Sequence, residues 1–137
     1  MKNILFHSGK HKPLPSLALL IQRLVFGAAM LTHGTPKIIH FSEWSKTFSD
    51  PFGIGGAWSF GLLVFAEFFC AILIILGLGT RPAAIVLVFA MGMAAFWAHS
   101  GEPFGKMELA VLFMAAFLVL LILGAGKYSL DKVISGK

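Results

Sequence analysis

The chain has 137 residues, of which 58% are hydrophobic and 12% are charged, and its formal net charge is +5. The charged share is about half of the roughly 25% found in soluble domains, which excludes an ordinary water-soluble surface and favours lipid contact. The eleven Lys and Arg residues are scattered and form no basic face or nucleic-acid motif, so we expect no nucleic-acid partner.

Four apolar segments follow one another and predict four membrane-spanning helices, at residues 15–39, 53–79, 82–100 and 105–126. Each supplies the roughly 20 residues that cross a bilayer as a helix. A soluble bundle is the alternative, but it would need polar outer faces that these segments lack. Because the connections are short, we expect one all-α domain over residues 1–137, an antiparallel up-down-up-down four-helix bundle in the membrane.

The first segment has a second interpretation, as a cleaved signal peptide. Lys10 and Lys12 precede its apolar run, as in a signal peptide. Arg23 lies inside that run, however, and a charge fits poorly in the apolar core of a signal peptide. We therefore favour a retained helix.

The distribution of basic residues predicts the orientation in the membrane. With four spans, both termini and the second connection share one side, which carries seven basic residues: Lys2, Lys10, Lys12, Arg81, Lys127, Lys132 and Lys137. The other side carries three, namely Lys37, Lys46 and Lys106. Basic residues accumulate on the cytoplasmic side, so we expect both termini in the cytoplasm.

Arg23 and Glu67 are charges within the predicted spans. Such charges are unfavourable by at least about 2.5–3.5 kcal/mol each and normally face a partner inside the bundle. If the outer ends of the first two helices are level near Ile38 and Ile54, Arg23 and Glu67 lie roughly 22 and 20 Å from those ends. The matching depths predict an intramembrane ion pair, which is either a structural lock or part of proton or electron chemistry.

Four polar residues lie within about two turns of the outer helix ends and form a candidate site: His33, Lys37, His99 and Glu108. Such a cluster offers hydrogen-bond donors for the carbonyls of a quinone and a route for protons. Each residue also has a simpler interpretation. Lys37 would snorkel to the interface, Glu108 would complement a helix N-terminus, His99 would be interfacial, and the cluster would be a polar plug.

No metal site is expected, because the histidines lack a close i, i+3 or i, i+4 repeat and the chain has one cysteine, Cys70. A single cysteine forms no internal disulfide and no C-x-x-C motif, so Cys70 is interpreted as a small buried apolar residue.

Several short motifs occur in a characteristic order between about residues 17 and 132. They are Arg23, "HGTPK", Ala66–Glu67, "LGLGTRPAA", Glu108 and "GKYSLD". In this order and spacing the chain resembles the DoxX family of small four-span membrane proteins. Pro36 departs from the pattern, and a helix that ended there would move Lys37 away from the candidate site.

The resemblance implies a role in membrane redox metabolism. The family is named after a membrane component associated with quinone-linked thiosulfate oxidation, and other members resemble partners in redox and thiol-stress assemblies. The implied polar positions are Arg23, His33, Lys37, Glu67 and Glu108. From this resemblance we expect a multi-pass protein of the bacterial inner membrane that is a quinone-interacting component of a membrane oxidoreductase.

The residues include no electron carrier, so a bound quinone or a redox protein partner must supply one. The alternative is a non-catalytic scaffold or assembly factor that recruits a soluble redox enzyme. Whether the chain is an enzyme, which donor and acceptor it serves and whether it forms a homo-oligomer stay open. A carrier or channel is disfavoured because the last two spans are apolar through their middle.

Overall fold

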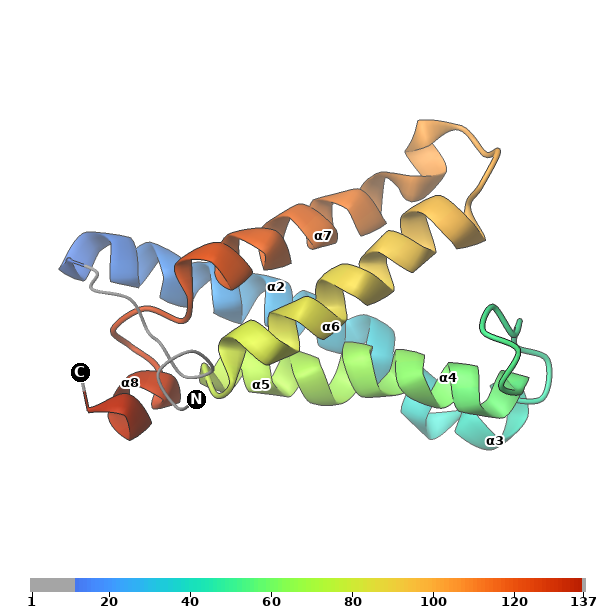
Figure 1. The fold of residues 1–137 in the computed structure, drawn as a ribbon, viewed down its shortest axis with the longest axis horizontal. Coiled ribbons are helices and arrows are strands. Elements are labelled where there is room, and N and C mark those ends of the chain that lie inside the picture. The colour runs from blue at the N-terminus through green and yellow to red at the C-terminus, as the bar shows by residue number, and fades with distance from the viewer. Residues whose placement is uncertain (1–11, 137) are drawn as a thin grey trace.

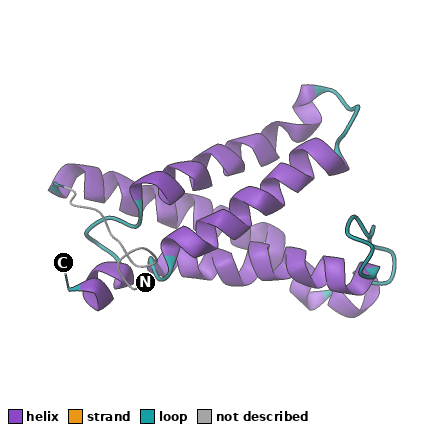
Figure 2. Cartoon of the chain, viewed as in Figure 1, coloured by secondary structure: helices purple, strands orange, loops and turns teal. Residues whose placement is uncertain are grey.

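The computed structural model describes residues 12–136, and in that part of the chain it consists of helices and loops (Figure 2). Four helical rods are each long and apolar enough to cross a membrane. The rods are α2 (Pro13–Ile39), α4–η1–α5 (Gly56–Val64, Phe65–Cys70 and Ala71–Leu76), α6–η2 (Thr80–Gly92 and Met93–Ala98) and α7 (Phe104–Leu123). Two short helices are added, α3 (Phe41–Trp44) and α8 (Leu130–Ser135). The expected all-α membrane bundle is confirmed.

Successive rods run in opposite directions, with α2 packed on the second rod and α6 packed on α7 (Figure 1). The start of α2, the end of α7 and α8 lie at one end, here called the terminal end. The opposite end, with residues 40–55 and 99–103, is called the loop end. Toward the loop end, α6 and α7 diverge from α4 (Figure 1).

Two glycines bring α2 into direct contact with the backbone of the second rod. The buried residues of α2 recur every three or four positions and include Gly27 and Gly34. A Cβ atom at Gly34 would lie 2.5 Å from the backbone oxygen of Glu67, so only glycine allows this approach. The contact sets the register of the two rods and puts Glu67 level with Gly34.

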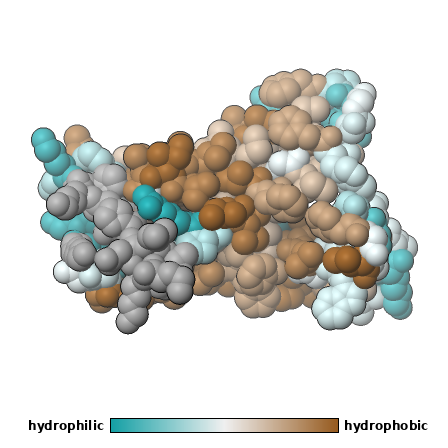
Figure 3. All heavy atoms as spheres, viewed as in Figure 1, coloured by the Kyte–Doolittle hydropathy of each residue, from teal (hydrophilic) through white to brown (hydrophobic). Residues whose placement is uncertain are grey.

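The outer surface is apolar between the two ends of the bundle. Figure 3 shows hydrophobic residues across the middle of one face and hydrophilic residues toward both ends. Large apolar side chains on all four rods are exposed, among them Ile21, Val25, Phe65, Phe89 and Ile122. In water this surface would be strongly unfavourable, whereas in a bilayer it contacts acyl chains.

Pro36 does not end the first helix. α2 continues through it to Ile39, and the amide of His40 still donates to the Pro36 carbonyl over 2.9 Å. A proline near a helix end removes only one backbone donor, so the last turn is kept. Lys37 therefore stays on the helix and next to the bundle, contrary to an early helix end.

The C-terminal segment after the fourth rod forms the helix α8. Ser129 is its N-cap and accepts a hydrogen bond from the Lys132 amide at 3.2 Å. The helix is held against the turn between α5 and α6, where the Asp131 amide donates to the Gly77 carbonyl at 2.8 Å. Both glycines of this turn, Gly77 and Gly79, have positive φ values of 67° and 56°.

Candidate functional site

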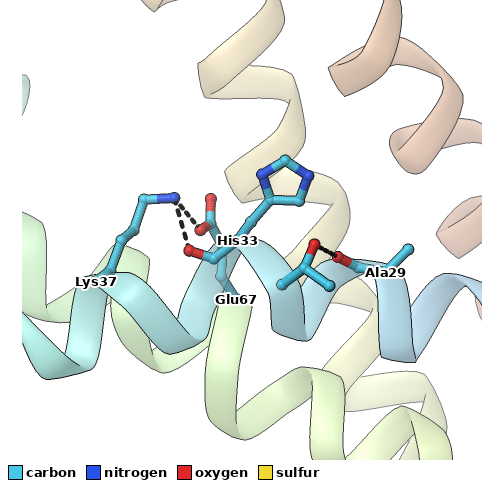
Figure 4. Close-up of polar contacts among 5 residues, drawn as sticks. Ala29, His33, Lys37 and Glu67 are labelled. Atoms are coloured by element: carbon cyan, nitrogen blue, oxygen red, sulfur yellow. Dashed lines mark hydrogen bonds and ion pairs between the residues drawn. The ribbon is translucent and has the colours of Figure 1, made fainter.

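An ion pair between Lys37 and Glu67 joins the first two rods inside the bundle. The Lys37 ammonium donates to Glu67 Oε2 and also lies 3.3 Å from the backbone oxygen of His33 (Figure 4). The Glu67 residue is 5% exposed, and the Lys37 side chain is 22% exposed. A buried carboxylate needs a cation or a proton, and here the cation reaches it from the last turn of α2.

The expected ion pair between Arg23 and Glu67 is not formed. The prediction assumed that the outer ends of the first two helices are level, but the Gly34 contact puts Glu67 beside the second turn from the end of α2. Arg23 lies eleven residues before Gly34 on the same helix, or roughly 16 Å along the axis. The two charges are therefore at different depths, and each has another partner.

Arg23 belongs to a polar cluster at the terminal end. The guanidinium Nη2 donates to the backbone oxygen of Tyr128, and the negative charge of Asp131 acts on it. Arg23 is 1% exposed, and its Nε and Nη1 atoms are buried without a hydrogen-bond partner in the described structure. Arg23 thus links α2 to the segment that leads into α8.

Asp131 connects the same cluster to the start of α6. Its carboxylate accepts hydrogen bonds from the amides of Gly79 at 2.7 Å and Thr80 at 3.0 Å. It is 2% exposed, so these bonds and the charge of Arg23 replace its solvation. Sequence reasoning missed Asp131, although a serine N-cap followed by an acidic residue in "YSLD" is a typical helix start.

A large apolar cavity adjoins the Lys37–Glu67 pair. It has a volume of about 480 Å³ and lies between the second and third rods toward the loop end. Of the residues that line it, only Lys37 and Glu67 are charged, and Ser59 is the only other polar side chain. Its rim carries exposed Phe65 and Phe89, so it opens on the lipid-facing surface. The cavity is an apolar recess with a polar inner wall.

Two π-helical segments form opposite walls of this cavity. Glu67 lies in η1 and Trp97 in η2, and both segments contribute several lining residues. A π-helical turn widens the helix and re-aims side chains, and such turns are frequent at functional sites. Periodicity alone does not reveal these turns, because an α-helix satisfies the same apolar pattern.

A second cavity, of about 190 Å³, contains the two histidines of the predicted site. His33 from α2 and His99 from the end of η2 both line it, together with Glu67 and Lys106. The His33 ring packs edge-on against Phe113, with the ring centres 5.8 Å apart. His99 Nδ1 lies 3.5 Å from Glu102 Oε1 at the cavity edge. Lys106 was not among the predicted site residues.

Glu108 does not join the other predicted site residues. It is exposed on the first turns of α7 and lines neither cavity. The spacing along α7 explains this, because Lys106, Leu109, Ala110 and Phe113 form the face toward the small cavity and Glu108 lies off it. The predicted four-residue site is therefore divided, with Lys37 on the large cavity, His33 and His99 on the small one, and Glu108 outside.

The described residues contain no group of three or more His, Cys, Asp or Glu side chains arranged to hold a metal ion.

Asp50 organises the loop that covers the large cavity. Its carboxylate accepts hydrogen bonds from the amides of Ile54 at 3.1 Å and Gly55 at 2.8 Å and from the Ser59 hydroxyl at 2.9 Å. The neighbouring Pro51 and Phe52 line the cavity. These hydrogen bonds, first that from Gly55, lower the pKa of Asp50 below its usual value.

The lowered pKa of Asp50 predicts the response of this loop to acid. A carboxylate with a lowered folded-state pKa stabilises the fold above its unfolded-state value near 4, and this is lost as pH falls through the lower folded-state pKa. We expect the 48–55 loop to become protease-sensitive only below about pH 4. Asp50→Ala should make the loop sensitive at pH 7, as limited proteolysis would show. Equal cleavage of this variant and the parent protein at pH 7 would contradict the role of Asp50.

The fold and its apolar surface define a small multi-pass membrane protein with four spanning helices and an internal ion pair. Residues 18–100 match the model of the DoxX family. The chain belongs to this family.

Known relatives share most of its length. An uncharacterized protein of Haemophilus influenzae is 36% identical over 80% of this chain and 84% of its own. The inner membrane proteins YphA and YqjF of Escherichia coli are 30% and 26% identical, over 93% and 92% of this chain and 95% and 98% of theirs. No solved structure matches. The protein is thus a multi-pass protein of the bacterial inner membrane.

Proposed function

We propose that the protein binds a quinone in the large cavity, as a component of a membrane oxidoreductase system. The observation that carries this proposal is an apolar cavity that opens toward lipid and ends at the Lys37–Glu67 ion pair. Its volume of about 480 Å³ lies within the range of small-molecule sites, which are mostly apolar with a few placed polar groups.

The chemistry of the cavity matches the two parts of a quinone. The head group has carbonyl oxygens that accept hydrogen bonds, and Lys37 offers a charged donor at the inner wall. The flat ring suits the aromatic lining, which includes Phe48, Phe52 and Trp97. The isoprenoid tail would leave between Phe65 and Phe89 into the bilayer, where it dissolves freely. Electrons would come from a partner protein, because the chain has no carrier of its own.

Lys37→Met is expected to weaken quinone binding about tenfold to a hundredfold, the equivalent of one hydrogen bond to a charged group. Binding of a short-chain quinone can be measured on protein in lipid nanodiscs by quenching of tryptophan fluorescence, because Trp97 lines the cavity. Lys46→Met is the matched control, since Lys46 is an exposed loop-end lysine that lines neither cavity.

Glu67→Gln is the second variant, because Lys37→Met leaves a buried carboxylate without its cation. Glu67→Gln keeps the shape of the site and a polar partner for Lys37. Quinone binding should therefore persist, and circular dichroism should show a folded bundle. Equal affinity of the parent protein and Lys37→Met would overturn the proposed site. Absence of quinone binding, with a stoichiometric partner crosslinked at the loop around Trp44, would favour the scaffold function instead.

The proposed orientation has both chain ends in the cytoplasm and the cavities in the outer half of the bilayer. The bias of basic residues toward the terminal end supports it. A C-terminal alkaline phosphatase fusion should then be inactive, whereas a fusion after Lys46 should be active, because this enzyme folds in the periplasm. An active C-terminal fusion and an inactive fusion after Lys46 would show the opposite orientation in the membrane.

A further inference from the structure

The two cavities share a wall that contains Glu67. Glu67 and Ala94 line both cavities, and the other polar groups are divided between them. Lys37 reaches the carboxylate from the large cavity, whereas His33, His99 and Lys106 line the small one. An apolar binding site and a more polar chamber thus meet at one buried carboxylate.

We infer that the small cavity is a water-filled route by which protons reach Glu67 from the loop end. The inference deepens the proposed function and rests on it. The route would supply a proton to Glu67 when Lys37 turns from this carboxylate to a bound quinone. A volume of about 190 Å³ holds several water molecules, and the three nitrogen-bearing side chains give them polar partners.

The polar groups of the small cavity descend from the loop end toward Glu67. Lys106 lies in the first turn of α7 and His99 directly follows η2, so both are at the mouth. His33 lies six residues before the end of α2, or roughly 9 Å along the helix. His99 Nδ1 is buried and lies 3.5 Å from Glu102 Oε1, so the His99 ring is held at the mouth by the loop that follows it.

The proton balance of the site is simple. In the unliganded site the charges of Lys37 and Glu67 cancel. When Lys37 donates to a ligand carbonyl, one proton moves from water in the small cavity to a Glu67 oxygen, and bulk water at the loop end replaces that proton. The groups that face Glu67 are then Lys37 and His33 from α2, His99 after η2 and Lys106 from α7.

Cysteine accessibility tests the water in this route. In a Cys70→Ala background, Ala110→Cys places a thiol on the small cavity, and Ala115→Cys places one on an exposed part of α7 that lines neither cavity. A thiol reacts as the thiolate, which forms in water and not in lipid. A charged, membrane-impermeant methanethiosulfonate should label Ala110→Cys at least about tenfold faster than Ala115→Cys. Equal or slower labelling of Ala110→Cys would overturn the inference.

Labelling with dicyclohexylcarbodiimide tests proton uptake by Glu67, because this apolar reagent modifies protonated carboxyl groups within membranes. Lys37→Met should be labelled at Glu67 about tenfold faster than the parent protein at pH 7, since a buried carboxylate that loses its cation takes up a proton. Glu67→Gln should abolish this label in mass spectra. Equal labelling of Lys37→Met and the parent protein would refute proton uptake. Neither experiment uses quinone, so their failure is distinguishable from failure of quinone binding.

Discussion

Replacing Asp131 by alanine is expected to lower the free energy of unfolding by about 2–4 kcal/mol, because leaving a buried hydrogen-bond donor without its acceptor costs about 1–3 kcal/mol. Asp131 supplies the charge that acts on Arg23 and accepts two amides at the start of α6. Its removal leaves a buried guanidinium without a counter-charge and the first turn of α6 without acceptors. Unfolding in mixed micelles with increasing sodium dodecyl sulfate would measure the change.

A double-mutant cycle separates the charge of Asp131 from its hydrogen bonds. Asp131→Asn keeps an acceptor but removes the charge, and Arg23→Met removes the buried cation. If the two charges stabilise each other, the double variant should be more stable than the sum of the single changes implies. Glu43→Ala, at an exposed carboxylate of the loop end, is the control and should change the free energy by less than about 0.5 kcal/mol. Strict additivity would show that Arg23 and Asp131 do not interact.

Gly34→Ala is expected to destabilise the bundle by about 1–3 kcal/mol, because the added methyl group has no space. The atoms it would meet are the backbone oxygen and carbon of Glu67 at 2.5 and 2.6 Å, and backbone cannot rotate away as a side chain does. The two rods must separate, and this moves η1 and Glu67 away from Lys37. Quinone binding should therefore weaken together with stability.

Gly105→Ala is the matched control for Gly34→Ala. Gly105 is also helical, but a Cβ atom there would meet no other atom within 4 Å. The alanine should be neutral or stabilising by up to about 1 kcal/mol, because glycine is the weaker helix former. If Gly34→Ala unfolds like Gly105→Ala and binds quinone like the parent protein, the close approach of α2 and η1 does not determine the site.

The pairing of the buried charges depends on the register of α2 against the second rod. The positions of the helix ends do not show this register. The contact at Gly34, not the helix end, sets the depth of Glu67, and it pairs the carboxylate with Lys37. Gly27 and Gly34 are small residues of the kind that allow close packing of membrane helices. The sequence does not say which residues of the second rod these two glycines contact, so it does not give the depth of Glu67.

For the predicted site residues, sequence position gave the depth in the bundle, whereas helix packing set the direction of each side chain. His33 and His99 were predicted to share a site, and they line one cavity because each is near the loop end of its rod. Glu108 shares their depth but not their direction, since the rotation of α7 depends on its contact with α6. Lys106, two residues earlier, takes the place expected for Glu108.

Composition and hydropathy were enough to predict the class of protein and the number of spanning helices. In a bilayer every backbone polar group must form its hydrogen bond within the protein, so four apolar segments of this length form four spanning helices. The partners of the buried charges became known from the packed bundle, because a partner depends on the register and rotation of whole helices. A helix shift of a few residues changes no composition, yet it decides that Glu67 pairs with Lys37 and that Arg23 donates to the Tyr128 carbonyl.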